Sequence, residues 1–514
     1  MTAPRERVSA PRERVSAPRS TRPHVAVLGG GFAGMAAALA LAAAGARVTL
    51  VERERRLGGK ADEWRDAGFR FDTGPSVLTL SEVVRTTFER VGLTCPLAFR
   101  PAAPLCRYVY PDGRVWDVYR ELEPTLAGLE PQEADAYRRA LAKARTLYEA
   151  AAPVFVHGPA PGLLRLAAYG LRHGLAAAPG RSLPDLLRAL GADGPLLLPF
   201  FMRFATYVGA DPRRAPAVLH NVAWAELGLG VHHLEGGTYA LVRALADALE
   251  ALGADLRLGE AVERLVTRAG TVREVHTTRG VLACDAVVAA VDRELVSGWL
   301  GRRRRERTAS LSGLVLLAGL RARDQRLARH TIVFPEDYGA EFDAIAGGEH
   351  PLDPTLYLHV SALDDVGDAP PGGENRFVMA NAPALPIEPE ASLQGEARAE
   401  RGRAALLASL ERRGFGWSEE ALVTSRWLDP TTFAAYGHRG RLYGHAPHGL
   451  LGALRPGPRL RLAANLALAG GSVHPGGGIP LALLSGTQAA ALLARRLGLR
   501  RSWPAPPPAA PTRG

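Results

Sequence analysis

Two strand-like apolar runs flank an alanine- and leucine-rich segment near the start of the chain. Residues 25–28 read Val-Ala-Val-Leu, a helical stretch follows the next glycines, and a second apolar run ends at Glu52. Uninterrupted apolar runs of this length are typical of parallel strands that are covered on both faces. The pattern therefore predicts a strand–helix–strand unit, with the helix beginning near Phe32.

The turn of this unit contains Gly29, Gly31 and Gly34. In a dinucleotide-binding unit such glycines permit a tight turn, approach of the backbone to a pyrophosphate, and close packing of helix on strand. The helix that follows would direct its N–H groups and the positive end of its dipole at the phosphates. Glu52, which comes 18 residues after Gly34, lies where a carboxylate binds ribose hydroxyls. A glycine turn alone would also fit a surface loop, but the complete order of signals predicts a dinucleotide site.

The same kind of pattern returns twice later in the chain. The predicted elements are a helix from Gly237 to Leu252, a strand at 255–258, a hairpin over 262–279, a buried strand over 285–292, and a last strand after Asn465 with a helix over 480–497. The dinucleotide domain is therefore discontinuous.

The intervening segments have a different character. Residues 108–116 read as a hairpin, residues 131–200 are dominantly helical, and residues 310–450 are mixed. We expect an α/β fold, in which a Rossmann-like, discontinuous cofactor domain carries an inserted mixed α+β substrate domain. The predicted parts are a basic disordered tail (1–23), the cofactor domain (24–107, 232–300 and 455–499), the substrate domain (108–231 and 301–454) and a proline-rich disordered tail (500–514).

Composition excludes several classes of protein. The chain has 514 residues, of which 47% are hydrophobic, and its three cysteines are too few and too scattered for a disulfide framework or a metal site. No apolar run reaches the roughly 18 residues of a spanning helix, and no apolar stretch suggests a secretory signal before Val25. We therefore expect a cytoplasmic protein. The sequence carries no signal for an oligomeric state.

The net charge of +11 is concentrated in two places. Residues 1–23 supply +4, from six arginines and two glutamates, and residues 302–307 supply another +4. Residues 3–16 consist of two identical copies of a seven-residue segment. No basic residues are interleaved with aromatic ones, so we expect no nucleic-acid partner. Attraction to an anionic membrane surface fits better, because a tail and a short basic cluster serve that role without a fold.

Two further motifs indicate which dinucleotide cofactor the chain binds. The turn Gly58-Gly59-Lys60 and the run Asp72-Thr73-Gly74-Pro75-Ser76 are not needed by a plain nicotinamide fold, and they resemble signatures of the flavoprotein amine oxidase and carotenoid desaturase group. Most members of that group carry arginine where this chain has Lys60, which keeps the charge but loses the bidentate fork. The resemblance implies FAD.

The run 469–481 ends in His-Pro-Gly-Gly-Gly-Ile-Pro-Leu and resembles the C-terminal signature of bacterial-type carotenoid (phytoene) desaturases. Its glycines would bring backbone close to a planar ligand, and Pro480 can start a helix. The segments 204–212, 442–449 and 470–475 are similar to 1-hydroxycarotenoid 3,4-desaturases. The alternatives are a phytoene desaturase, a flavin amine oxidase, and a prenyl-binding carrier that has lost its flavin.

The cofactor residues predicted from these motifs fall at both ends of the chain. They are Gly29, Gly31, Phe32, Ala33, Gly34, Glu52, Arg53, Gly59, Lys60, Gly74, Pro75, Ser76, Val262, Gly470, Gly471, Gly478, Ile479 and Pro480. Val262 is included because relatives contact adenine through the backbone at the start of the middle hairpin. A core valine would look the same.

The resemblance implies removal of two hydrogens from neighbouring carbons of a long apolar carotenoid. His474, His445 and His233 are the candidate proton acceptors, with His448 as a further candidate, although a histidine beside a glycine turn is often only hydrogen-bonded to backbone. Phe204 and Tyr207 are the candidate substrate residues, together with Phe200 and Phe201; all four also fit an ordinary helix core.

The segment 155–190 predicts how such a substrate is reached. It reads as helical, with Arg165, Arg172, His173 and Arg181 among leucines and alanines. Such a helix can lie in a membrane interface and admit a lipid-dissolved substrate, although a surface helix of the substrate domain is an equally good interpretation. We expect peripheral association with the membrane.

Overall fold

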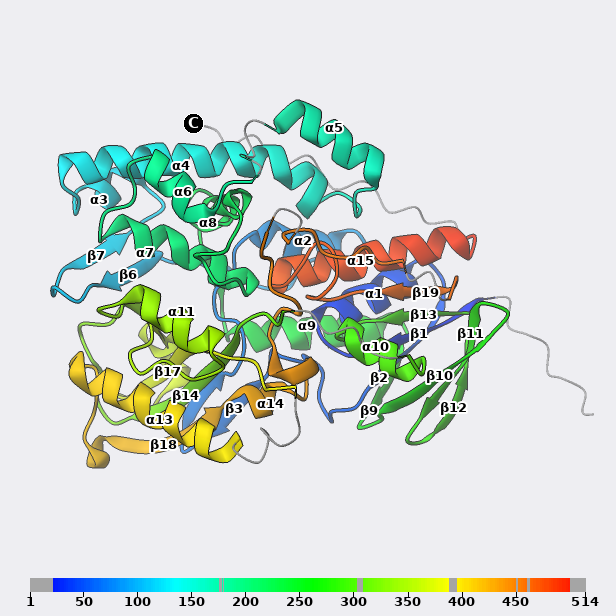
Figure 1. The fold of residues 1–514 in the computed structure, drawn as a ribbon. Helices are drawn as coiled ribbons and strands as arrows, with labels where there is room; N and C mark the ends of the chain where they lie inside the picture. Colours follow the sequence, from blue (N-terminus) through cyan, green and yellow to red (C-terminus); the bar gives the residue numbers. More distant parts are fainter. Residues whose placement is uncertain are drawn as a thin grey trace, which may run out of the picture.

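In the computed structural model, residues 22–174, 178, 180–302, 308–387, 395–449, 452–459 and 463–499 are described. The two predicted tails, except for residues 22 and 23, and most of the arginine cluster at 302–307 lie outside the described residues. The described chain forms two main sheets with a helical layer beside them (Figure 1).

A five-stranded parallel sheet forms the first part. Its strand order is β19-β13-β1-β2-β9, with β1 paired to β13 on one side and to β2 on the other. The strands are β1 (His24–Leu28), β2 (Arg47–Glu52), β9 (Asp255–Leu258), β13 (Ala286–Ala289) and β19 (Leu466–Leu468). Apart from β1 and β2, strands that adjoin in the sheet therefore come from chain segments more than 170 residues apart.

Both faces of this sheet are covered, which explains its unbroken apolar strands. One face carries α1 (Phe32–Ala43), α2 (Ser81–Glu89), α9 (Thr238–Ala251) and α15 (Ile479–Arg496), packed in a single apolar cluster. The other face packs against a three-stranded sheet and α10. These elements are β10 (Val262–Arg268), β11 (Thr271–Thr277), β12 (Gly280–Ala283) and α10 (Arg293–Trp299).

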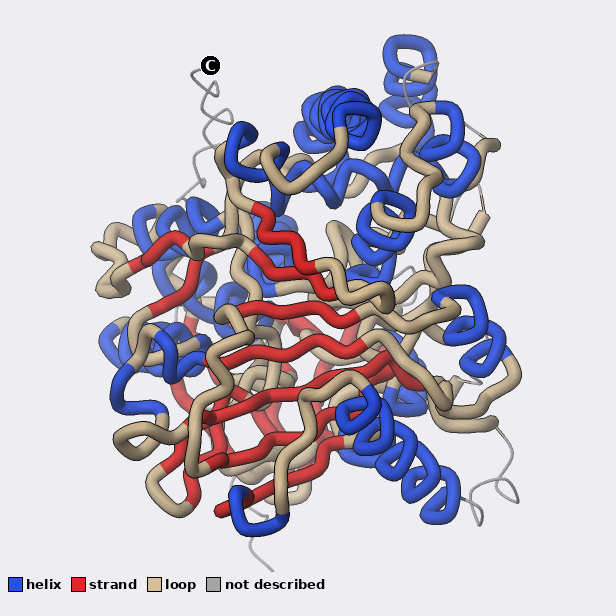
Figure 2. Tube along the Cα trace, turned by 90° about the vertical axis from the view of Figure 1, so that its left-hand side faces the viewer, coloured by secondary structure: helices blue, strands red, loops and turns tan. Residues whose placement is uncertain are grey.

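The second part is a seven-stranded mixed sheet with the order β18-β14-β17-β16-β15-β6-β7. The strands are β6 (Cys106–Val109), β7 (Val115–Val118), β14 (Ser312–Leu320), β15 (His330–Val333), β16 (Leu356–Val360), β17 (Glu374–Ala382) and β18 (Leu422–Leu428). Figure 2 shows these strands side by side, with helices above them. Leu406 and Leu410 of α13 (Gly395–Arg412) pack on one face.

A helical layer lies beyond β6 and β7 (Figure 1). It consists of α3 (Leu122–Leu126), α4 (Pro131–Ala151), a π-helical turn (Ala152–Val156), α5 (Leu163–His173), α6 (Leu183–Ala189), α7 (Leu197–Met202), two 3-10 turns (Arg203–Val208 and Ala217–His220) and α8 (Asn221–Leu227). The predicted single helical segment 155–190 is therefore wrong in its continuity, because prolines at 159 and 161 interrupt it.

Short elements connect these parts. They are β3 (Glu63–Asp66), β4 (Phe69–Asp72), β5 (Phe99–Pro101), β8 (His232–Leu234), α11 (Tyr338–Ala346), α14 (Pro430–Phe433), and 3-10 turns at Ser361–Leu363, Val366–Asp368, Glu419–Ala421 and His438–Gly440. The predicted α/β fold class is confirmed, with a discontinuous parallel sheet and a mixed second part. The exact boundaries of the two domains stay a prediction.

Candidate functional site

A long cavity of about 470 Å³, here cavity A, lies where the glycine turns of the parallel sheet face the large sheet. It brings together residues from both ends of the chain. The predicted cofactor residues that line it are Gly29, Gly31, Phe32, Ala33, Glu52, Arg53, Gly59, Lys60, Gly74, Pro75, Val262, Gly470, Gly471, Gly478 and Ile479. One continuous space thus joins segments that are more than 400 residues apart.

The first glycine turn is shaped by contact of the backbone with itself. Gly29 adopts a φ of +101°, which side chains rarely allow. A Cβ on Gly34 would lie 1.8 Å from the Gly29 carbonyl oxygen, so Gly34 lets α1 pack against the turn. Gly34 itself does not line cavity A. No side chain caps the start of α1, and its first residues, Phe32 and Ala33, line cavity A, so their N–H groups are available to a ligand there.

Glu52 is fixed at the edge of cavity A. Its carboxylate accepts hydrogen bonds from the backbone N–H of Gly30 (2.6 Å) and of Glu54 (2.9 Å). Each carboxylate oxygen has lone pairs left after these bonds. The geometry therefore fits the predicted role in binding ribose hydroxyls.

The far end of cavity A holds residues that the sequence did not single out. Glu260, Ala261 and Trp299 line it beside Val262. Trp299 closes α10 and presents an aromatic ring of the kind that stacks on a base. A lone tryptophan in a short helix gives no sequence signal, because a packed one would look the same.

Lys60 lies at the inner end of cavity A, beside a buried ion pair. Its Nζ donates to the Leu442 carbonyl, and Arg441 pairs with Asp292 at 3.1 Å. Burial lowers the pKa of Lys60 to about 8, although the Asp292 carboxylate opposes this shift and the Arg441 guanidinium adds to it. A lysine at this place can therefore change its charge near neutral pH.

The second glycine run forms the opposite wall. Gly478, with a φ of +98°, precedes α15, and Pro480 occupies its first turn. Ser485 holds the run in place, because its Oγ accepts from the Gly470 N–H (3.1 Å) and donates to the His474 carbonyl (2.9 Å). Gly478 and Ile479, at the positive end of α15, therefore line cavity A.

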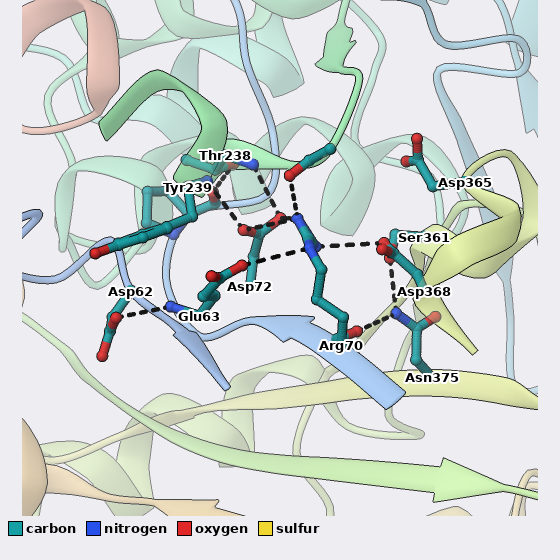
Figure 3. Close-up of polar contacts among 12 residues, drawn as sticks. Asp62, Glu63, Arg70, Asp72, Thr238, Tyr239, Ser361, Asp365, Asp368 and Asn375 are labelled. Carbon is teal, nitrogen blue, oxygen red and sulfur yellow. Dashed lines mark hydrogen bonds and ion pairs between the residues drawn. The ribbon is translucent and has the colours of Figure 1, made fainter. Parts of the chain in front are cut away.

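The Asp72–Ser76 run is anchored by a buried charge network (Figure 3). Asp72 accepts from the Thr238 and Tyr239 N–H groups at 2.9 and 3.1 Å, which caps the start of α9. Arg70 pairs with Asp72 and with Asp368, each at 3.3 Å. Asp72 is therefore a structural anchor. It holds Gly74 and Pro75 at the cavity walls.

A second cavity of about 300 Å³, here cavity B, adjoins cavity A and is mostly apolar. The residues that line both cavities are Gly74, Pro75, Phe377, Met379, Leu442, Tyr443, Gly477, Gly478 and Ile479. A Cβ on Gly477 would lie 2.4 Å from the Tyr443 ring, so this glycine lets the ring pack at the junction. Two predicted cofactor residues, Ser76 and Pro480, line cavity B and not cavity A.

One face of the large sheet forms a continuous floor from cavity A to cavity B. Val315, Met379, Tyr357 and Ile332 are successive cross-strand partners on β14, β17, β16 and β15. Val315 lines cavity A, Met379 lines both, and Tyr357 and Ile332 line cavity B. Directly opposed residues have Cβ atoms about 5 Å apart. The residues of this row are therefore close neighbours, and only a short distance separates cavity A from cavity B.

None of the three predicted proton acceptors lines cavity A or the adjoining cavity B. His474 bonds through Nε2 to the Gly158 carbonyl at 3.0 Å, and His445 borders a separate small cavity. His233 is buried on β8, while the further candidate His448 accepts from the Asp211 N–H at 2.9 Å. The sequence places these histidines near glycine turns but does not show the direction of their side chains, and their catalytic role stays a prediction.

Only one of the predicted substrate residues lines a cavity. Tyr207 lines cavity B, whereas Phe204 is buried beneath the Arg203 guanidinium, 4.0 Å from its ring centre. Phe200 and Phe201 are fully buried in the core of the helical layer. These three phenylalanines belong to the core of the helical layer and line neither cavity A nor cavity B.

Comparison with known proteins gives the family. The model of flavin containing amine oxidoreductases matches residues 32–494. The chain is 35% identical to hydroxyneurosporene desaturase of Cereibacter sphaeroides (93% of this chain, 99% of the relative) and 35% identical to phytoene dehydrogenase of Streptomyces griseus (91% and 94%). Cyclohexylamine oxidase of Brevibacterium oxydans has the same fold, with a TM-score of 0.61 at 16% identity over 93% of this chain and all of that one.

The chain belongs to the flavin containing amine oxidoreductase family. It is an FAD-dependent oxidoreductase, and the predicted resemblance to carotenoid desaturases is confirmed by its curated relatives. The glycine turns, the carboxylate of Glu52 and the helix ends at cavity A fit such a cofactor. The assignment of individual residues to FAD stays a prediction.

The charge on Lys60 predicts how FAD binding depends on pH. An anionic cofactor near Nζ favours the ammonium form, so binding above pH 8 must take up a proton. We expect the affinity for FAD to fall about tenfold between pH 7 and pH 9, measured by quenching of flavin fluorescence. Lys60→Arg, which stays charged, should bind FAD with nearly constant affinity over the same range. A parallel loss in both proteins would exclude Lys60 as the cause.

Proposed function

We propose that the protein removes two hydrogens from neighbouring carbons of an acyclic carotenoid, and specifically that it desaturates the 3,4 bond of a 1-hydroxycarotenoid. When bound, FAD would supply the oxidising power as a hydride acceptor. The relatives named hydroxyneurosporene desaturase and 1-hydroxycarotenoid 3,4-desaturase support this choice, the latter at 28% identity over 89% of this chain. The amine oxidase alternative is weaker, because the 35% identical relatives carry desaturase or dehydrogenase names.

The side chains that line cavity B are the main support for an oxygenated substrate. Its walls are mostly apolar, as a polyene requires, but the polar side chains of Tyr338 and Asn221 also belong to its lining. The buried Tyr338 Oη has no hydrogen-bond partner among the described residues. The Asn221 side chain also lines cavity B and makes no hydrogen bond within the part of the chain that the structure describes.

A third polar group stands close to the junction of the cavities. Asn381 follows Met379 by two residues on the same face of β17, and two residues of a strand span about 7 Å. Its Nδ2 donates to buried Glu341 at 2.8 Å, which leaves its carbonyl oxygen for a ligand. A substrate hydroxyl placed near the reacting bond can therefore find both donors and acceptors.

Tyr207, by contrast, is already fully engaged. Its Oη accepts from Arg203 (2.6 Å) and donates to Glu226 (2.9 Å). The buried ion pair between Arg203 and Glu226 holds the wall of cavity B in place near Asn221. The pair therefore serves to hold the cavity in shape, while the unpartnered groups select the ligand.

A pure hydrocarbon such as phytoene is the runner-up substrate. Phytoene would leave Tyr338 and Asn221 buried without partners, at a cost of about 1–3 kcal/mol for each group. A site built to bind a hydroxyl therefore discriminates against the analogue that lacks one. This difference is the reason for preferring a hydroxylated carotenoid.

Tyr338→Phe tests this preference. We expect kcat/KM for a 1-hydroxylated acyclic carotenoid to fall about tenfold, and kcat/KM for the parent hydrocarbon to stay the same or rise. Product spectra of both substrates in liposomes provide the measurement. Tyr110→Phe is the matched control, because the Tyr110 Oη donates to the Leu196 carbonyl and lines neither cavity. Equal losses on both substrates would contradict hydroxyl recognition.

We also propose that the protein works at the cytoplasmic membrane surface, where a water-insoluble substrate is dissolved. No described helix is long and apolar enough to cross a membrane. Helix α5, however, exposes Leu163, Leu164 and Leu171, each at least 86% accessible. Figure 1 shows α5 at the outer edge of the molecule, above α2 and α15.

The surroundings of α5 support membrane contact. Arg165 and Arg172 lie among the exposed leucines, and residues 152–184 contain no aspartate or glutamate. A helix with one apolar face and basic residues suits an interface with anionic lipids. Val156, which precedes the loop to α5, lines cavity B. Val156, at the substrate cavity, and Leu163, at the start of the helix that we propose contacts the membrane, are thus seven residues apart along the chain.

A further inference from the structure

Three buried histidines, His233, His330 and His359, form a cluster behind cavity B. The rings of His330 and His359 stack with their centres 5.0 Å apart. Both ring nitrogens of His233, and the Nε2 atoms of His330 and His359, have no hydrogen-bond partner among the described residues. Buried polar atoms without partners are rare in native proteins, so such a cluster requires an explanation. No described group of three such side chains has the geometry to hold a metal ion.

Tyr357 connects this cluster to the cavity. Its Oη lies 2.8 Å from the His330 Nδ1 and 2.6 Å from the Ser76 Oγ. Tyr357 and Ser76 both line cavity B. Tyr357 is also the direct cross-strand partner of Met379, which borders both cavities. The hydroxyl therefore stands near the point where a substrate in cavity B would meet a flavin in cavity A.

We propose that Tyr357 accepts the proton that leaves the substrate during desaturation and passes its own hydroxyl proton to His330. The inference rests on the proposed function. In the step, one C–H bond of the substrate gives a hydride to oxidised FAD, and the neighbouring C–H bond breaks to form the double bond. Its electron pair becomes the new π bond, and its proton goes to the Tyr357 Oη as the Tyr357 hydrogen moves to the His330 Nδ1.

The surrounding hydrogen bonds suit this exchange. When Tyr357 donates to His330 and accepts from Ser76, one lone pair of Oη stays available for the substrate proton. Burial, with the charge of Arg329 and the neighbouring His233, lowers the pKa of His330 to about 3. The ring is therefore neutral and ready to accept at physiological pH. A weak base suffices, because loss of a hydride makes the neighbouring C–H strongly acidic.

The low basicity of His330 also favours turnover. A protonated ring in this environment releases its proton readily, so it returns to the neutral form when product leaves and cavity B admits water. Tyr357 is the catalytic residue in this account, since it borders the substrate cavity. His330 is a positioning residue that acts through Tyr357.

Tyr357→Phe tests the proposal. The FAD-loaded protein is mixed without oxygen with a 1-hydroxylated acyclic carotenoid in liposomes, and reduction of the flavin is followed by its absorbance. We expect the rate to fall by about 10²- to 10⁴-fold, with FAD content and carotenoid binding unchanged. The solvent isotope effect on this step in the unchanged protein should disappear in Tyr357→Phe. A rate within about threefold of the unchanged protein would overturn the proposal.

Further variants keep the test decisive. His330→Gln retains a hydrogen-bond acceptor for Tyr357 but cannot take up a proton at neutral pH, so it should slow flavin reduction without weakening substrate binding. Tyr110→Phe is the control, because the Tyr110 Oη donates to the Leu196 carbonyl and lines neither cavity, and it should keep both the rate and the solvent isotope effect. If the unchanged, FAD-loaded protein is reduced by no acyclic carotenoid, the proposed function fails, and the inference falls with it.

Discussion

Arg70→Met should lower the free energy of unfolding by about 3–5 kcal/mol, the cost typical of breaking a buried ion pair from one side. The Arg70 side chain is 3% exposed and lies between Asp72 and Asp368. Its removal leaves both carboxylates buried with their main counter-charge gone, and burial already raises the pKa of each. The measurement is urea-induced unfolding of the FAD-loaded protein, followed by far-UV circular dichroism and flavin fluorescence.

Arg65→Met is the matched control. Arg65 lies on the neighbouring strand β3 and pairs with Glu63 at 3.4 Å, but its side chain is 59% exposed. Exposed pairs of this kind contribute about 0–1 kcal/mol. Equal stability of the two variants would show that the Arg70 network does not anchor the Asp72–Ser76 run. We also expect Arg70→Met to release FAD at lower urea concentration, since that run borders cavity A.

Replacing Leu163, Leu164 and Leu171 with serine should weaken binding to anionic liposomes by more than about a hundredfold. Full burial of one leucine side chain contributes about 1.5–3 kcal/mol, and three partly inserted leucines together exceed the roughly 2.8 kcal/mol that a hundredfold change requires. Sedimentation with vesicles measures the binding. FAD content should not change, because none of the three lines cavity A.

Leu352→Ser separates this effect from a general loss of surface hydrophobicity. Leu352 is 80% exposed and follows α11, far along the chain from α5. Its replacement should leave vesicle binding within about twofold. Retention of vesicle binding by the triple variant would show that another surface makes the contact.

Local signals in the sequence were enough to predict the cofactor end of the molecule. Gly29, Gly31 and Gly34 lie within six residues, and each constrains its own neighbourhood, so the turn and the start of α1 could be read directly. The C-terminal glycine run and Pro480 gave the start of α15 in the same way. Such signals depend on backbone conformation, which nearby residues largely determine.

The surroundings of the proposed catalytic residue could not be predicted in this way, because they depend on contacts between distant segments. Ser76 and Tyr357 are 281 positions apart, and a tyrosine within an apolar strand reads as core. Asp292 and Arg441 beside Lys60 are 149 positions apart. The predicted histidines lie next to glycine turns, whereas His330 and His359, behind cavity B, lie inside ordinary strands. Sequence patterns show which side chains of a strand share a face, but they do not show which distant segments pack on that face.

The most direct test of the central claim is anaerobic reduction of the bound flavin by an acyclic carotenoid. The FAD-loaded protein is mixed with a 1-hydroxylated acyclic carotenoid in liposomes, and one spectrum records both partners. We predict that the flavin absorbance bleaches while the carotenoid bands shift to longer wavelength, with one double bond formed for each flavin reduced. A flavin that stays oxidised with every acyclic carotenoid, yet is reduced by amines with release of hydrogen peroxide in air, would contradict the account.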